Sequence, residues 1–142
     1  MNADFENRQR RILVADDEEY IVRVVSFKLE SAGYEVVEAI DGADAWSKVR
    51  AGDIDLVLTD HQMPLMTGLE LAGRIAADPA TRHIPVIMLT ARGFRLDAEE
   101  IVASRIVELI AKPFSPRGLL DRIRETLDST ERGGERGGER AA

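Results

Sequence analysis

The sequence predicts an α/β protein built on a doubly wound, five-stranded parallel sheet. Five short stretches rich in valine, isoleucine and leucine alternate with longer stretches of helical periodicity. Most of the short stretches show little alternation of apolar and polar residues, which is typical of strands buried on both faces of a parallel sheet. Strand and helix alternate five times, and right-handed crossovers then place helices on both faces of the sheet.

The elements follow in order along the chain. Strands are predicted at residues 12–15, 35–39, 54–59, 85–90 and 106–111. Helices are predicted at residues 18–32, 42–51, 65–77, 97–105 and 115–127, each with apolar residues on one side. The first two helices end before Gly33 and Gly52, and the third ends before Asp78-Pro79. Ser115 is a suitable N-cap for the last helix, with Pro116 at its first position.

Length and composition limit the function classes. The 142 residues suit one domain, which we place at residues 11–128 between an N-terminal extension (1–10) and a flexible tail (129–142) of Glu-Arg-Gly-Gly repeats. The net charge of −7 argues against direct binding of nucleic acid. The absence of cysteine, of a signal peptide and of a membrane-spanning stretch favours a cytoplasmic protein without a membrane partner.

Polar side chains stand at the ends of four predicted strands. Asp16 and Asp17 follow the first strand, Asp60 the third and Lys112 the fifth, while Thr90 ends the fourth. The carboxyl ends of parallel strands share one edge of the sheet, so these groups are expected to meet there. Three converging carboxylates repel one another, and a divalent cation with oxygen ligands, such as Mg²⁺, relieves that repulsion. The set predicts a socket for a phosphoryl group beside a carboxylate nucleophile.

Each of these residues also has an ordinary structural explanation. Asp16-Asp17 alone is compatible with a helix N-cap, Asp60 with a turn residue and Lys112 with a solvated charge. His61, next to Asp60, is interpreted as a solvated turn residue. The functional interpretation depends on the whole set appearing at strand ends in the right order.

These motifs resemble those of response-regulator receiver domains over about residues 11–128. The segments that carry the resemblance are 12–18 (ILVADDE), 56–64 (LVLTDHQMP), Gly68, 88–91 (MLTA) and 112–114 (KPF). The resemblance implies a flavodoxin-like fold with strand order 2-1-3-4-5.

It also implies that Asp60 is the phosphoacceptor. Asp17, Asp60 and the backbone carbonyl of Gln62 would be Mg²⁺ ligands, with Asp16 assisting. Thr90 and Lys112 would contact the phosphoryl group, and the Lys112-Pro113 bond would be cis. The chain departs from the family at Leu109, where an aromatic residue is usual, and at Arg105-Ile106, where Gly-Ala is usual.

The leading functional hypothesis is a signalling switch of a two-component phosphorelay. A histidine kinase or phosphotransfer protein would phosphorylate Asp60, and a downstream protein would recognise the face built from residues 97–105, 106–111 and 115–127. With no effector domain following, output is expected through protein contact, with homodimer formation an open alternative. Catalysis would be limited to the protein's own phosphorylation and dephosphorylation. An aspartate phosphatase is disfavoured, because Gln62 cannot serve as general acid. A scaffold whose output is uncoupled from phosphate is the serious alternative, because Leu109 lacks a ring.

Overall fold

Five parallel strands form a single sheet in the computed structural model, which describes residues 9–141 and the side chains of residues 9–130. The strands are β1 (Arg11–Ala15), β2 (Glu35–Ala39), β3 (Leu56–Asp60), β4 (Val86–Thr90) and β5 (Glu108–Ala111). Their order in the sheet is β2-β1-β3-β4-β5, so the predicted fold class and strand order are confirmed. Most of the predicted N-terminal extension, residues 1–8, lies outside the described part of the chain.

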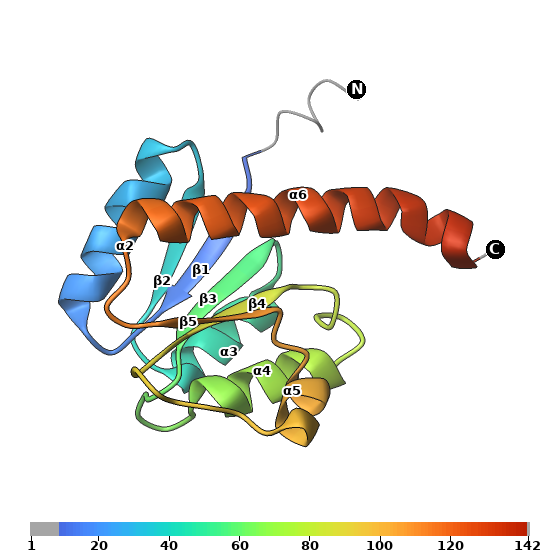
Figure 1. Cartoon of the computed structure of the whole chain (residues 1–142). Coiled ribbons are helices and arrows are strands. Elements are labelled where there is room, and N and C mark those ends of the chain that lie inside the picture. The colour runs from blue at the N-terminus through green and yellow to red at the C-terminus, as the bar shows by residue number, and fades with distance from the viewer. Residues whose placement is uncertain (1–8, 142) are drawn as a thin grey trace.

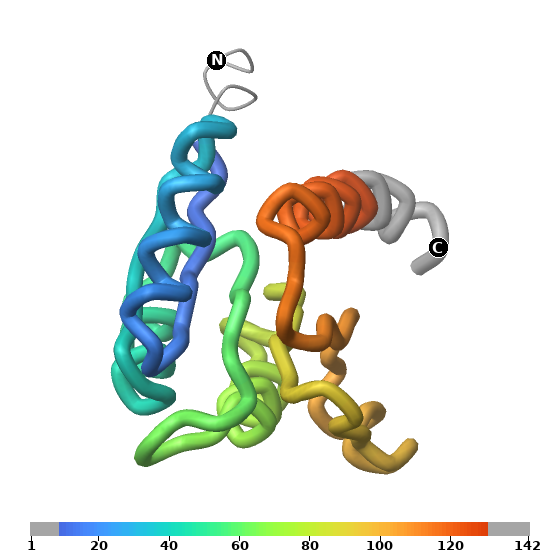
Figure 2. Tube along the Cα trace, turned by 60° about the vertical axis from the view of Figure 1, so that its left-hand side comes forward, coloured from blue at the N-terminus to red at the C-terminus, as the bar shows by residue number. Residues whose placement is uncertain are grey.

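Two helical layers enclose the sheet (Figure 1). The helices are α2 (Glu19–Ser31), α3 (Gly42–Ala51), α4 (Gly68–Ala77), α5 (Ala98–Ser104) and α6 (Pro116–Ala141). α2 and α6 lie on one face, and α3, α4 and α5 lie on the other, as the turned view in Figure 2 also shows. This is the doubly wound arrangement that the alternation of strands and helices predicted.

The core is divided by the sheet into two apolar clusters. Successive residues of a strand point to opposite faces, so Leu13 packs with α3 and α4 while Ile12 and Val14 pack with α2 and α6. β3 and β4 are buried along their whole length. The central strands therefore hold the residues at their carboxyl ends on a rigid base.

The start of α4 differs from the prediction. The helix begins at Gly68 rather than at residue 65, because Thr67 and Glu70 form a capping box that fixes its first turn. Leu65 lies outside the helix with φ 70°, and the N–H of Met66 donates to the carbonyl of Pro64 at 2.8 Å. This is a tight turn around a left-handed residue.

The last two helices also differ from the prediction at their ends. α5 ends with Arg105 in the left-handed conformation (φ 57°), and the N–H of Arg105 donates to the carbonyl of Ile101 at 2.9 Å. α6 continues to Ala141, beyond the predicted end at residue 127. The side chains of residues 131–142 lie outside the described part, and the flexible tail stays a prediction.

Candidate functional site

The hydrogen-bonded sheet extends up to the predicted site. The N–H of His61, next to Asp60, donates to the carbonyl of Leu89 at 2.9 Å. The N–H of Lys112 donates to the carbonyl of Thr90 at 2.7 Å. The backbone therefore fixes Asp60, Thr90 and Lys112 at the same edge of the sheet.

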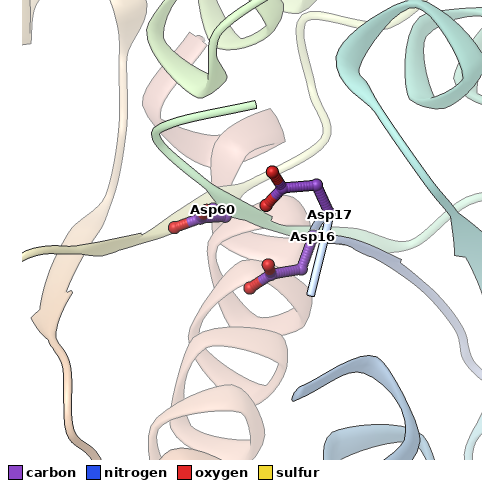
Figure 3. A group of neighbouring side chains, drawn as sticks. All are labelled: Asp16, Asp17 and Asp60. Atoms are coloured by element: carbon purple, nitrogen blue, oxygen red, sulfur yellow. The ribbon is translucent and has the colours of Figure 1, made fainter. Parts of the chain in front are cut away.

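Three carboxylates meet at this edge (Figure 3). Asp16, Asp17 and Asp60 each offer one oxygen, and these oxygens lie within 4.8 Å of one another. Asp16 and Asp60 are 2% and 7% exposed, whereas Asp17 is exposed. The sequence prediction that these residues converge is supported by this geometry.

The Lys112 ammonium binds the acidic group. Its Nζ lies 3.2 Å from Asp16 Oδ2, 3.2 Å from Asp60 Oδ1 and 3.0 Å from Glu18 Oε1. Glu18 was not among the predicted site residues. Its position directly after Asp16-Asp17 at the start of a helix was the only available signal, and the sequence alone does not show that its side chain turns toward Lys112.

Burial sets the ionisation of these groups. Burial raises the pKa of Asp16 from 3.8 to about 6, although a hydrogen bond from the Glu18 N–H (2.9 Å) and the Lys112 charge oppose the rise. Burial likewise raises the pKa of Asp60, against the opposing charge of Lys112. For Lys112, burial alone would lower the pKa, but hydrogen bonds and charges from the carboxylates outweigh it and raise the pKa. The Lys112 ammonium thus neutralises only part of the negative charge that the carboxylates bring to the site.

A cleft of about 360 Å³ opens above the carboxylates. It is lined by Asp17, Glu18, Asp60, His61, Gln62, Ala91 and Lys112. Thr90 does not line it; this residue is 3% exposed and lies at the end of β4, directly before Ala91. Of the predicted residues, Asp17, Asp60, Gln62 and Lys112 line the opening. Asp16 is buried next to Asp17 and Asp60, and Thr90 lies beside the opening.

Gly68 allows the loop after β3 to close against the acceptor strand. A Cβ at this position would lie 2.3 Å from the backbone oxygen of Asp60. The N–H of Gly68 donates to the carbonyl of His61 at 2.7 Å. Only glycine permits this approach without moving the backbone that carries Asp60.

His61 is not the solvated turn residue that the sequence suggested. Its ring is half-buried and lies against Phe94, with ring centroids 4.4 Å apart and planes inclined by 38°. Burial lowers the pKa of His61, although the charge of Glu100 opposes this. No sequence pattern indicates this contact, because Phe94 belongs to a loop 33 positions away.

Two further predictions concern β5 and the residues after it. The Lys112-Pro113 peptide bond is cis, as predicted. Leu109, at the usual aromatic position, is half-buried and packs against the core cluster on the α3–α4 face. The bond geometry expected for the family is present, while the ring is replaced by an aliphatic side chain.

The donor set suits a hard cation. Carboxylate oxygens and carbonyl groups are the ligands that Mg²⁺ prefers, and the described residues include one such acidic group, formed by Asp16, Asp17 and Asp60. Uncompensated negative charge at this point would be relieved by a divalent ion. The site is chemically able to hold one. Separately, within the described part of the chain no helix has the length and apolar character needed to cross a membrane.

Comparison with known sequences agrees with this geometry. The family described as "Response regulator receiver domain" matches residues 12–124. Chemotaxis protein CheY1 of Helicobacter pylori (strain J99) is 33% identical over 123 residues, covering 85% of this chain and 99% of CheY1. The phosphate regulon transcriptional regulatory protein PhoB of Pseudomonas aeruginosa is 38% identical over 121 residues, covering 85% of this chain and 53% of PhoB.

Solved structures show the same relationship. A CheY-like response regulator receiver domain protein from Methanospirillum hungatei superposes with a TM-score of 0.79 at 30% identity, covering 88% of this chain and 98% of that one. CheY4 of Vibrio cholerae gives a TM-score of 0.77 at 31% identity, covering 83% of this chain and 98% of that one. The fold, the acidic cleft and these similarities lead to one conclusion: the chain belongs to the response regulator receiver domain family and has a role in phosphorylation-based signalling.

Proposed function

We propose that this protein is a phosphorylation-dependent switch that accepts a phosphoryl group on Asp60 from a partner histidine kinase or histidine phosphotransfer protein. The observation that carries the proposal is the position of the Asp60 carboxylate, which lines an open cleft and lies 3.2 Å from the Lys112 ammonium beside two further carboxylates. No purely structural role requires three acids and one base to converge at an open edge.

In the proposed reaction, an oxygen of Asp60 attacks the phosphorus of a phosphohistidine. The phosphorus–oxygen bond forms, the phosphorus–nitrogen bond breaks, and the imidazole nitrogen of the donor leaves with the electron pair. Lys112 offsets the negative charge that develops on the phosphoryl oxygens, and it stays in the site through its pairs with Asp16 and Glu18.

Asp16, Asp17, Asp60 and the carbonyl of Gln62 would hold Mg²⁺. When bound, this ion would neutralise charge on the transferred phosphoryl group. The donor set supports the assignment, because hard oxygen ligands surround the cleft. Ala91 lines the same cleft and has a small side chain, which leaves room for the donor.

The protein is proposed to act as a switch and not as an enzyme with a separate substrate. It would promote only its own phosphorylation and dephosphorylation. The position two residues after Asp60 is Gln62, which cannot exchange protons as the general acid of an aspartate phosphatase does. The acidic, cysteine-free composition supports a cytoplasmic location.

Output is proposed to pass through the face formed by α5, β5 and α6. Val102 and Val107 are 75% and 53% exposed there, which is favourable for contact with a downstream protein or a second copy. Arg122 of α6 donates to Glu108 of β5 at 2.7 Å and ties two elements of the face together. Phosphorylation would draw Thr90 toward the phosphoryl group and change this face.

An uncoupled scaffold is the second candidate, and Leu109 is the observation that favours it. An aliphatic side chain at this position repacks with less change of shape than a ring. In that case Asp60 would accept a phosphoryl group without altering the affinity for a downstream protein.

Intact-mass measurement tests the chemistry directly. Wild-type protein is incubated with acetyl phosphate, with and without Mg²⁺, beside Asp60→Asn and the control Asp53→Asn, which alters an exposed acid at the other end of β3. We expect one Mg²⁺-dependent phosphoryl adduct in wild type and in Asp53→Asn, and none in Asp60→Asn. An unmodified wild type, or an adduct that persists in Asp60→Asn, would contradict the proposal.

A further inference from the structure

A ring contact joins the acceptor strand to the loop after β4. His61 directly follows Asp60, and Phe94 lies in the loop between β4 and α5. Their ring centroids are 4.4 Å apart with the planes inclined by 38°, at the short limit of the separations at which aromatic pairs attract one another. The contact therefore bridges the two segments that flank the cleft.

Phe94 is mechanically tied to Thr90. The N–H of Phe94 donates to the carbonyl of Ala91 at 3.1 Å, and Gly93 has φ 84°, as the third residue of a type II turn requires. Thr90 immediately precedes this turn. A displacement of Thr90 is thus passed on to the Phe94 ring through one closed turn.

Phe94 packs on the same face of the sheet as Leu109, the position at which the family usually has an aromatic residue. Phe94 and Leu109 both lie against the core cluster on the α3–α4 face. Leu109 has no ring, whereas Phe94 has one and holds it against His61, which lines the cleft.

The hydrogen-bonding capacity of the His61 ring is not fully used. His61 Nδ1 is buried, and no group in the described part of the chain hydrogen-bonds it. A buried polar atom without a partner destabilises the conformation that buries it. Release of the ring lets this nitrogen find a partner, which lowers the cost of breaking the contact.

We propose that the His61–Phe94 ring pair is the switch contact of this chain: it is closed while Asp60 is free and opens when Asp60 is occupied, so that its opening passes the signal to α5. The proposal rests on the proposed function, because occupancy of Asp60 is what moves Thr90. Coupling between the ring pair and the Asp60 site is reciprocal. A substitution that weakens the ring contact must therefore raise the affinity of the Asp60 site for a phosphoryl group or its analogue.

The two histidines of the chain report directly on the state of the ring pair: His61 belongs to the pair, and His83 serves as an internal control. Beryllofluoride with Mg²⁺ serves as the probe, and histidine ring signals are followed by NMR. His83 is exposed and precedes β4 at the opposite edge of the sheet. We expect the His61 ring signals to shift on addition of the probe as the Phe94 ring moves away, while those of His83 stay in place.

Two matched variants separate a switch contact from simple proximity to Asp60. Phe94→Leu removes the ring and keeps an apolar side chain; the control Phe114→Leu alters another half-buried phenylalanine, which packs on the opposite face. We expect Phe94→Leu to bind beryllofluoride two- to tenfold more tightly than wild type, since a contact that opposes occupancy is lost. Phe114→Leu should bind it as wild type does. The NMR shifts of the α5 backbone amides should also change. In Phe94→Leu without beryllofluoride they should lie closer to the shifts of wild type with beryllofluoride bound.

Equal or weaker binding by Phe94→Leu would overturn the proposal. The proposal would also be overturned if acetyl phosphate modifies Asp60 and beryllofluoride binds, yet the His61 ring signals of wild type do not move. In that case the proposed phosphorylation of Asp60 would stand and only the role of the ring pair would fall. Wild type that neither forms the phosphoryl adduct nor binds beryllofluoride would overturn the proposed function and this inference with it.

Discussion

Replacing Asp16 with asparagine is expected to stabilise the protein when no Mg²⁺ is added. Asp16 is 2% exposed, and burial raises its pKa from 3.8 to about 6. At neutral pH the folded protein therefore holds a carboxylate whose charge burial opposes. Asparagine removes the charge and keeps an oxygen that can accept the Glu18 N–H bond, now 2.9 Å long.

The magnitude follows from the pKa. A rise from 3.8 to about 6 corresponds to a cost of about 3 kcal/mol, at about 1.36 kcal/mol for each pKa unit. Because the folded state binds the proton more tightly, the cost is absent below about pH 4, grows as the pH rises, and is complete above about pH 6. The pKa already includes the attraction of Lys112, which keeps Glu18 and Asp60 as partners in the variant, so we expect a gain of about 1–3 kcal/mol at neutral pH.

Urea denaturation between pH 5 and pH 8 measures this gain. At about pH 5 it should be roughly half of its value at neutral pH. Asp17→Asn is the control, because Asp17 is exposed and its charge costs little to solvate. Added Mg²⁺ should stabilise wild type more than Asp16→Asn and so narrow the difference. A gain that does not change with pH, or a larger gain for Asp17→Asn, would refute the reasoning.

Three further substitutions test the frame of the site by thermal and urea unfolding. Gly68→Ala should destabilise the protein by about 2 kcal/mol or more and slow phosphorylation, because the new Cβ would lie 2.3 Å from the Asp60 backbone oxygen. The control is Gly73→Ala in the same helix, which has open space around it and should show neither effect. Leu65→Gly should stabilise by about 0.5–1 kcal/mol, since it relieves a left-handed leucine; a loss of stability would contradict this. Lys112→Met should destabilise by about 2 kcal/mol, because it leaves the carboxylates unpaired, and added Mg²⁺ should recover part of the loss. An Mg²⁺-independent loss would show that Lys112 acts chiefly through packing.

The fold and most of the site could be predicted because both depend on local patterns. Unbroken apolar stretches identify strands buried on two faces, and parallel strands bring their carboxyl ends together. Asp16, Asp60 and Lys112 therefore met as expected, although they are separated by as many as 96 positions. In a parallel sheet, knowing that a residue ends a strand is enough to place it at the edge.

The features that were missed depend on side-chain direction or on competing local signals. Glu18 was missed because its reach to Lys112 is a tertiary contact. The start of α4 was placed too early because Leu65 fits the apolar helical pattern. The Thr67–Glu70 capping box outweighs that pattern, and its sequence signature was available. Contacts between loops, such as that between His61 and Phe94, have no counterpart in the periodicity of either segment.

The division of the core by the sheet has a consequence for how the protein can change. Neighbouring residues of a strand, such as Leu13 and Val14, belong to clusters on opposite faces. A substitution that remodels the packing of α2 and α6 is therefore expected to leave the packing of α3 and α4 largely intact, because sites without shared partners act independently, and the reverse holds too. The two helical layers can be redesigned or diversify separately, with the shared carboxyl edge as the one region where each must remain compatible with the other. Libraries restricted to a single layer should accordingly alter partner preference while sparing phosphorylation of Asp60.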